Sequence, residues 1–595
     1  MNSWKRLIVL ALSALAGLGI LGLAIGIIFI DFVVDYWWHT AQGYQEYFWL
    51  KYLYRYILSG GATVFFFLIF LLNFTAASRY LGIDLEEMGR ITAREFNRRK
   101  RLIRHFQTGS MRVYIPLSAL MSIAIAAPFY NDWQQALLFV FGPESGVKDF
   151  FFAHDVSFYL FSFPIYQLIQ QELLNAALVL MAALTVLYAI EHRLTAGHIG
   201  HWPIGAKIHL SGMIIVIALI LAWGFSLERF QLLYTEENEP QFFGPGLIET
   251  DYFLPLIWVS VVSLVATTFA ALWFLHRRRG GRNLAILGTL FVLSVGFRHV
   301  HSIPEAVNRF IVNPNPVTTE MDHMRANIDS TLRGFDLTHI TNIDVTPGIP
   351  DEDVLDPELR THLYNIPVWD PELLYDGFQQ LQGIRPYYQF SDVDVDRYPV
   401  NGRIEQINLA ARELNIRRLP KEAQNWENTH LRFTHGYGAV AVPASQDGQT
   451  PMRWYLQDLT MEASSGFAAS NRPDLYYGEE DLQYAIVPNS LKVVGIPSVD
   501  ELSSFSYSGS GGVPINSLLR KLFFAIYFRE ERLFFSLSIT GDSHALFHRN
   551  IIDRVQTLTP FLKLDHDPYL VVTPTRNYWV IDAYTVSDWY PVSKR

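Results

Sequence analysis

The chain has 595 residues, 50% of them hydrophobic and 17% charged, and a net charge of −10, a mixture that suits a protein partly in a membrane and partly in water. It has no cysteine, which excludes disulfides, thiolate metal sites and a cysteine nucleophile. Residues 301–595 hold 25 Lys and Arg against 38 Asp and Glu, and this acidic balance argues against nucleic acid as a partner.

The first half of the chain contains seven apolar segments of about the length that crosses a bilayer. They are Leu7–Ile30, Ile57–Tyr80, Val113–Tyr130, Gln167–Ile190, Ile208–Phe225, Phe253–Leu275 and Leu284–Phe297. Lys5 and Arg6 precede the first segment, which lacks a convincing cleavage site, so we interpret it as an uncleaved signal anchor. These segments predict a transmembrane domain of seven helices over residues 1–300.

The loops between these segments differ in basic residues. Loops 81–112, 191–207 and 276–282 together hold 14 Lys and Arg, whereas the opposite loops hold 4. Because basic loops stay in the cytoplasm, we expect a cytoplasmic N-terminus and residues 301–595 on the extracytoplasmic side of the membrane. Residues 90–107 are either an amphipathic helix on the inner leaflet or a solvated basic loop. The middle third of every segment lacks charge, which argues against an ion-coupled pump.

The segments expected outside the membrane are rich in aromatic residues. We call seven of them the aromatic collar: Trp37, Trp38, Phe48, Trp49, Phe158, Tyr159 and Phe161. Exposed apolar patches mark contact sites, so we predict that the outer domain docks rigidly on this collar, with Pro304–Phe310 as a stalk. The alternative is that these rings face lipid or another protein and that the outer domain swings freely.

Residues 301–595 predict an extracytoplasmic domain of the mixed α/β (α+β) class, as one domain or two lobes. Helices are expected at Leu373–Leu381, Arg403–Asn415, Ile515–Tyr527 and Asn550–Phe561. Strands are expected at Leu431–Val442, Trp454–Leu459, Gln483–Val487 and Arg532–Ile539, and a hairpin joins Tyr569–Val572 to Tyr578–Ala583.

Three patterns in this domain are candidate binding sites. The alternating Asp392, Asp394 and Asp396 resemble calcium ligands. In a strand, however, alternation places all three carboxylates on one solvated face, and that interpretation, which we favour, predicts no effect of a chelator on the melting temperature. Gly511 and Gly512 precede an expected helix and could hold an anion, or simply permit a tight turn.

Histidines and aspartates form a second candidate group. They are His430, His435, His544, His548, Asp565, His566 and Asp567. Such a set could bind zinc or transfer protons, but its spacing fits no known zinc motif, and satisfied core or surface residues are the alternative.

Several longer segments carry a resemblance. The segments WWHTAQGYQEYFW (37–49), PEAVNRFIVNPNP (304–316), GGVPINSLLRKLFFA (511–525) and YWVIDAYTVSDWYP (578–591) resemble the uncharacterised bacterial membrane protein family UPF0182. The resemblance implies seven spans and a large extracytoplasmic region, and it transfers no activity and no catalytic residue. Members of the family continue past the YWVIDAYT segment.

The sequence supports three functional hypotheses. The first is a non-enzymatic scaffold or assembly partner in the cell envelope, bound to the lipid bilayer and to other membrane or envelope proteins. The second is a membrane-tethered hydrolase or transferase, metal-dependent or not, acting on lipid or polysaccharide. The third is a transporter of a neutral or lipidic substrate. No cofactor is required by any motif, and the oligomeric state is open.

Overall fold

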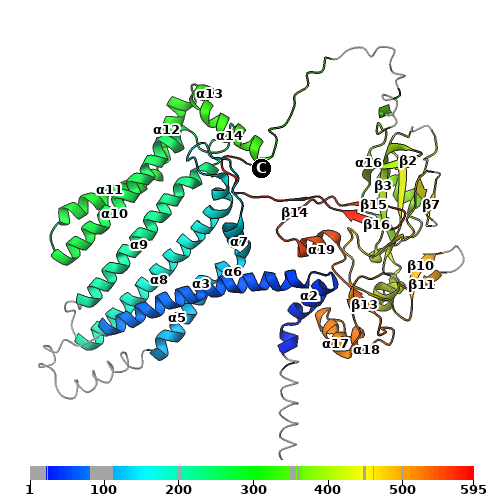
Figure 1. Ribbon diagram of the computed structural model, residues 1–595, viewed down its shortest axis with the longest axis horizontal. Coiled ribbons are helices and arrows are strands. Elements are labelled where there is room, and N and C mark those ends of the chain that lie inside the picture. Colours follow the sequence, from blue (N-terminus) through cyan, green and yellow to red (C-terminus); the bar gives the residue numbers. More distant parts are fainter. Residues whose placement is uncertain are drawn as a thin grey trace, which may run out of the picture. The chain divides into compact units, whose positions relative to one another are not determined.

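The computed structural model describes residues 22, 25–80, 111–196, 204–346, 357, 362–363, 365–446, 450–459, 461–464, 466–497, 502–507 and 509–594 (Figure 1). The chain forms two compact units, and the division does not fall at residue 300. The helical unit comprises Lys51–Asp344 and Ser587–Arg595. The sheet unit comprises Met1–Leu50 and Val345–Val586. Most of the first predicted span and all of residues 90–107 lie outside the described residues.

The helical unit is built from long apolar helices. They are α3 (Gln45–Tyr80, which begins in the sheet unit), α5 (Met111–Ala126), α8 (Phe163–Ala196), α9 (Ile204–Gln231), α10 (Leu254–Arg277) and α11 (Gly281–Arg298). Among the described residues, four helices are long and apolar enough to cross a membrane, or five if a bent pair counts as one span. α5 is a shorter apolar helix. The structure therefore confirms several membrane-span-like helices in this half of the chain.

Neighbouring helices of this unit pack side by side, in the order α8, α9, α10 and α11. Phe70, Phe74 and Leu184 form part of a buried core, while many Leu, Val and Ile side chains on the outer faces are exposed. Such apolar outer faces suit helices surrounded by lipid.

The chain bends after α11. α12 (Ser302–Val307) and a π-helical turn (Asn308–Val312) follow at an angle of 56° to α11, so the expected stalk does not continue its axis. The main segment of the helical unit goes on through α13 (Pro316–Thr319) and α14 (Met321–Gly334) and ends at Asp344, and Ser587–Arg595 completes the unit.

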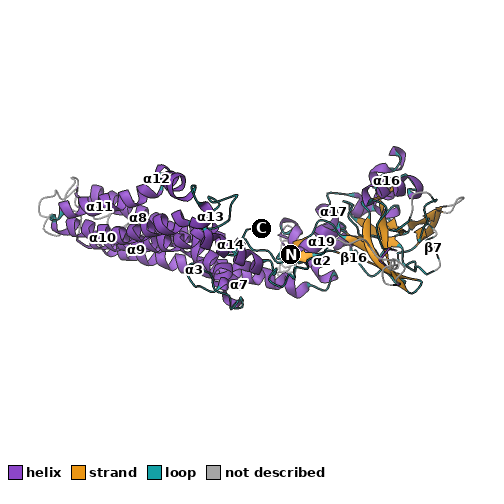
Figure 2. Ribbon diagram, turned by 90° about the horizontal axis from the view of Figure 1, so that it is seen from above, coloured by secondary structure: helices purple, strands orange, loops and turns teal. Residues whose placement is uncertain are grey.

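The sheet unit contains a six-stranded antiparallel sheet (Figure 2). Its strands are β1 (Tyr388–Phe390), β2 (Asp394–Val400), β3 (Arg403–Leu414), β5 (Ala439–Pro443), β6 (Leu456–Gln457) and β7 (Glu462–Ala463). The order is β1-β3-β5-β6-β7, with β2 also paired to β3. A mixed helix and sheet architecture is thus confirmed for this half.

The predicted helix at Arg403–Asn415 is wrong, because these residues form β3. Ile404, Ile407, Ala411 and Leu414 have helical spacing, but the strand lies inside the sheet and is covered on both faces. Leu409 and Ala411 belong to the core on one face, and Ala410 to the core on the other. Burial on both faces removes the alternation that identifies a half-buried strand.

Two different layers cover the faces of this sheet. α16 (Pro371–Gln382) packs on one face through Leu374 and Phe378. On the other face, the core includes Leu570 and Val572 of β15 (Tyr569–Val572). β15 pairs with β16 (Asn577–Val580), which confirms the predicted hairpin.

A smaller antiparallel sheet has the order β12-β13-β9 and consists of Val513–Pro514, His544–Leu546 and Ala485–Val487. α17 (Leu518–Tyr527) and α2 (Ile30–Ala41) share one core with it, in which Ile30, Val34 and Trp38 follow one stripe of α2. The N-terminal segment is therefore part of the sheet unit.

The strand predicted at Arg532–Ile539 is wrong, because α18 (Arg532–Phe535) is a short helix followed by a turn. The apolar residues of this segment alternate as they do in a strand, but no neighbouring strand pairs with it among the described residues. The helix expected at Asn550–Phe561 is confirmed as α19 (Ile551–Leu558).

Candidate metal centre

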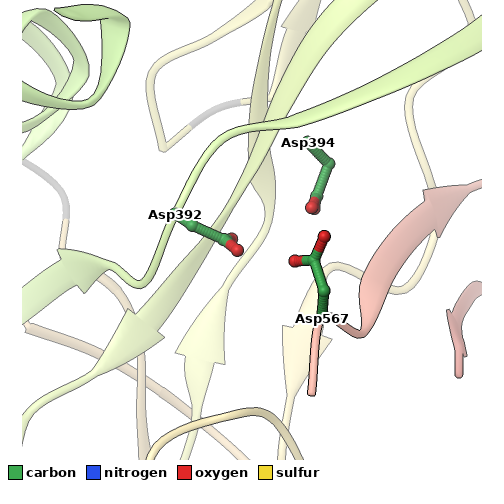
Figure 3. Close-up of side chains that lie close together, drawn as sticks. All are labelled: Asp392, Asp394 and Asp567. Atoms are coloured by element: carbon green, nitrogen blue, oxygen red, sulfur yellow. The ribbon is translucent and has the colours of Figure 1, made fainter. Parts of the chain in front are cut away.

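Three aspartates from two distant segments meet at one edge of the sheet unit (Figure 3). Asp392 lies in the loop between β1 and β2, and Asp394 is the first residue of β2, paired with Leu409 of β3. Asp567 lies between β14 (Lys563–Leu564) and β15. Figure 3 shows the three carboxylates pointing toward a common centre. All three candidate metal ligands at this centre are therefore carboxylate oxygens.

The three carboxylates are close enough to share one ion. One oxygen of each lies within 4.8 Å of the others. Ca²⁺ takes several oxygen ligands in flexible geometry, whereas Mg²⁺ dehydrates reluctantly and is seldom held by protein ligands alone. A set of carboxylate oxygens therefore suits Ca²⁺ better than Mg²⁺, and it disfavours zinc.

Two glutamates place further carboxyl groups beside the aspartates. Glu413 of β3 is buried, and its carboxylate accepts hydrogen bonds from the backbone N–H groups of Glu479 and Glu480, each at 3.0 Å. A Cβ at Gly478 would lie 2.2 Å from Oε2 of Glu413, so only glycine allows this turn to close on the carboxylate. The turn places Glu479 where the charges of Asp392, Asp394 and Asp567 act on it.

Burial and repulsion between neighbouring carboxylates raise the pKa of Asp392, Asp394 and Glu479. Burial, followed by the charge of Asp567, raises the pKa of Asp392 to about 6. Burial, followed by the charges of Asp392 and Asp567, raises the pKa of Asp394 to about 8. Burial and the neighbouring carboxylates raise the pKa of Glu479 to about 9. A divalent cation would remove the repulsion and allow all of these groups to ionise.

The aspartate triplet predicted from sequence is only partly brought together. Asp392 and Asp394 belong to the cluster, whereas Asp396 does not, and Asp567 takes the third place. The carboxylate of Asp396 accepts a hydrogen bond from the N–H of Arg397 instead. From the sequence, Asp567 belongs to the His/Asp group that is a candidate for zinc binding or proton transfer, and not to the aspartate triplet.

The histidines are distributed over several places. His430 and His548 line one cavity of about 420 Å³ together with Tyr484, Tyr527 and Glu530. Burial lowers the pKa of both histidines, which keeps them neutral. The cavity holds no group of three metal-ligating side chains among the described residues.

His435 lies apart from that cavity, fully buried, and its Nδ1 is 2.8 Å from the carbonyl oxygen of Gly436. His544 lies in β13, and Asp565 and His566 follow β14. The described parts of the chain therefore do not assemble the predicted His/Asp set into one zinc site.

The predicted anion site lies before α17. The N–H of Gly511 donates to the hydroxyl of Tyr507 at 3.0 Å, and Gly512 has a φ of +94°. α17 begins at Leu518, and the side chain of Ser517 caps it by accepting from the N–H of Arg520. Anion binding at Gly511 and Gly512 stays a prediction, and here the glycines serve the turn.

The aromatic collar is divided between the two units. Within the sheet unit, the ring of Trp37 lies beside the rings of Phe523 and Phe524. The ring centroids of Trp38 and His548 are 4.9 Å apart. Phe48 and Trp49 pack on Phe32, also within the sheet unit.

The other three collar rings lie in the helical unit. Phe158 and Tyr159 belong to a core that also contains Val592 near the end of the chain, and Phe161 lies close to Gly142. Rigid docking of the whole outer domain on the collar stays a prediction.

Comparison with known proteins gives relatives but no activity. Residues 12–595 match the model of an uncharacterised protein family (UPF0182). A UPF0182 protein of Methylococcus capsulatus is 54% identical over 549 residues, which cover 92% of this chain and 61% of the relative. A UPF0182 protein of Syntrophobacter fumaroxidans is 41% identical over 591 residues, covering 99% of this chain and 68% of the relative. This chain thus spans less than two thirds of the Methylococcus protein. No solved structure matches.

Proposed function

Since the chain belongs to the uncharacterised protein family UPF0182, we propose from its own residues that it is a non-enzymatic scaffold of the bacterial cell membrane that binds Ca²⁺ in the extracytoplasmic part of its sheet unit, residues 345–586. The observation that carries this proposal is the cluster of Asp392, Asp394 and Asp567. The ion would join β2 of the main sheet to the segment that leads into β15. Its role is to hold this surface in the form that other envelope proteins bind.

The position of the cluster favours a structural ion over a catalytic one. β15 already contributes Leu570 and Val572 to the core beneath the sheet, and the N–H of Val572 donates to the hydroxyl of Tyr398 at 2.8 Å. An ion between Asp394 and Asp567 would add a cross-link beside these contacts. A metal that joins two segments stabilises the folded state by its full binding free energy.

The expected location of the sheet unit agrees with such an ion. Basic loops predict that residues 301–595 lie outside the cytoplasm. Extracellular modules bind Ca²⁺ with dissociation constants of about 10⁻⁴–10⁻³ M, so a site of three carboxylates is sufficient there. We propose seven spans with the N-terminus in the cytoplasm. A reporter fused at Arg595 should be active only outside the membrane, and activity in the cytoplasm would contradict this topology.

The calcium site is tested by thermal unfolding of the full chain in detergent, with added Ca²⁺, Mg²⁺ or a chelator. A ligand present at 100 times its dissociation constant stabilises by about 2.7 kcal/mol, and about 1 kcal/mol shifts the melting temperature of a unit this size by about 2–4 °C. We therefore expect Ca²⁺ to raise the apparent melting temperature by several degrees, and more than Mg²⁺ does.

A matched pair of variants assigns the effect to the cluster. Asp394→Asn should abolish the shift caused by Ca²⁺, whereas Asp396→Asn, two residues along the same strand, should retain it. If the chelator has no effect on the unmodified chain, the solvated-face interpretation holds and the calcium proposal is wrong. If both variants respond alike, the ion binds elsewhere.

A further inference from the structure

The end of the N-terminal apolar segment lies against α17 within the sheet unit. A Cβ at Gly26 would lie 2.8 Å from Cζ of Phe523, so the ring of Phe523 sits directly on the backbone there. Eleven residues further along, Trp37 packs on Phe523 and Phe524, at ring-centroid distances of 5.6 and 5.9 Å. Figure 1 shows α17 and α18 beside the first described turns of this N-terminal helix. α17 therefore packs beside the C-terminal end of the apolar segment.

That segment has the composition of a membrane span. Residues 7–30 contain no charged side chain, and Asp31 follows immediately. In its described part, Ile25, Ile28 and Phe29 are exposed, while the face at Gly26 touches Phe523. Exposed apolar residues at the end of such a segment are in place for contact with lipid.

The helices beside this segment expose apolar side chains of their own. Four large ones are mostly solvent-accessible: Leu518 (72%), Leu519 (54%), Phe535 (74%) and Leu537 (95%). We call these four residues the α17–α18 face. Leu519 precedes Phe523 by four residues and so lies on the same side of α17, one turn away. A group of exposed apolar residues beside a membrane span is unlike an ordinary water-facing surface.

The two basic residues of α17 bind other groups of the sheet unit and are not left free beside the exposed leucines. The guanidinium of Arg520 lies 4.8 Å from the centroid of the Trp37 ring and donates to the carbonyl of Pro514 at 2.8 Å. The ammonium of Lys521 donates to the carbonyl of Ile539 at 2.9 Å. Both cations are thus engaged within the unit, and the leucines before them can enter an apolar phase without carrying a charge with them.

We propose that the α17–α18 face inserts into the acyl-chain region of the leaflet from which the N-terminal segment emerges. The occupant is lipid, because Phe523, one turn from Leu519 on α17, contacts Gly26 in the segment of residues 7–30, which has the composition of a membrane span. Helices of this kind lie in the interface with their apolar residues in the acyl boundary. The sheet unit then contacts the membrane at two adjoining points, the N-terminal segment and the α17–α18 face. These two contacts fix the tilt of the unit relative to the bilayer. This inference does not depend on the calcium site.

The test measures bilayer depth at single positions in the full chain. The chain has no cysteine, so one introduced cysteine carries one nitroxide label. Leu519→Cys, Phe535→Cys and Leu537→Cys report on the face, and all three side chains are exposed, so the substitutions cost little stability. The matched control is Leu373→Cys on α16, a leucine that is 66% exposed, and Figure 1 draws α16 at the opposite end of the sheet unit from α17.

The labelled proteins are reconstituted in phosphatidylcholine vesicles, and collisions with oxygen and with a water-soluble nickel chelate are compared. Oxygen concentrates in the bilayer and the chelate is excluded from it. We expect the oxygen-to-nickel collision ratio at the face to exceed that at position 373 several-fold and to approach the ratio for Ile28→Cys. Equal ratios at the face and at position 373 would show a water-exposed surface. Suppression of both kinds of collision would show a protein partner. Either result overturns the proposal.

Discussion

The sheet unit satisfies the charge of its two buried arginines differently from the charge of its aspartate cluster. Arg412 and Arg549 are almost completely buried, and each guanidinium donates to backbone carbonyls. Both guanidinium groups therefore have hydrogen-bond acceptors within the protein and need no ligand. Asp392, Asp394 and Asp567 instead bring three groups of the same sign together. The comparison teaches that burial alone does not identify a binding site: an unbalanced charge does, because only that charge gains from a further ion.

Removing a satisfied charge should produce the largest effect. Arg549 donates to the carbonyl oxygens of Tyr476, Gln483 and Thr434. Arg549→Met leaves these buried acceptors unpaired, at about 1–3 kcal/mol each. We expect a loss of at least about 3 kcal/mol in the free energy of unfolding, seen as a lower melting temperature. Arg576→Met, at an exposed position, should change stability by at most about 0.5 kcal/mol. Similar melting temperatures for the two variants would contradict the distinction drawn here.

An intermediate effect is expected from pH and calcium together. The pKa of Asp394 is raised from 3.8 to about 8 in the folded state. A carboxyl with a raised pKa stabilises the fold while protonated, so without a cation stability falls as pH rises from about 4 to about 8. Ca²⁺ must displace these protons. The stabilisation by Ca²⁺ should therefore grow from near zero at about pH 5 to about 2–3 kcal/mol at about pH 9 in the presence of excess ion.

That dependence is measured by melting the protein over the pH range with Ca²⁺ and with a chelator. The same series with Asp394→Asn serves as the control, since this variant should show no growth of the calcium effect with pH. A calcium effect that is constant across the range would mean that no proton is released on binding, and that the ligands are not these carboxyls.

The smallest effect concerns Glu413, which borders the cluster but has its own partners. Glu413→Gln replaces one acceptor oxygen by an NH₂ group facing the N–H groups of Glu479 or Glu480. We expect destabilisation by about 1–2 kcal/mol with the calcium shift retained. Ser391→Ala removes a single 3.3 Å hydrogen bond to the same carboxylate and should cost less. If Glu413→Gln instead abolishes the calcium response, Glu413 is itself a calcium ligand and belongs with the unbalanced carboxylates, not with the satisfied charges.

Local patterns in the sequence predicted what depends on local structure. Apolar runs identified the long helices, because a span must be apolar along its whole length. The hairpin at Tyr569–Val572 followed from two β-rich runs and a short turn. The helix predicted at Arg403–Asn415 failed because sheet pairing on both sides overrode a helical spacing. The family itself was identified correctly from its segments.

The site depended on contacts that no local pattern contains. Alternation selected Asp392 and Asp394 correctly but suggested Asp396 by continuing the same strand. Asp567 is far along the chain, and only the packing of β15 beneath the sheet brings it to β2. The pairing of α2 with α17 was likewise invisible, although the stripe Ile30, Val34 and Trp38 could have indicated a second buried face.

The contact between α2 and α17 also has a consequence for biosynthesis. α2 ends at Ala41 and α17 begins at Leu518, so roughly 480 residues separate the two helices. At about 5–20 residues per second, α2 leaves the ribosome on the order of half a minute or more before its partner exists. During that interval the apolar stripe of Ile30, Val34 and Trp38 has no native cover from α17. Nascent chains of this protein are therefore expected to need the translocation machinery or a chaperone to shield α2 until synthesis is nearly complete.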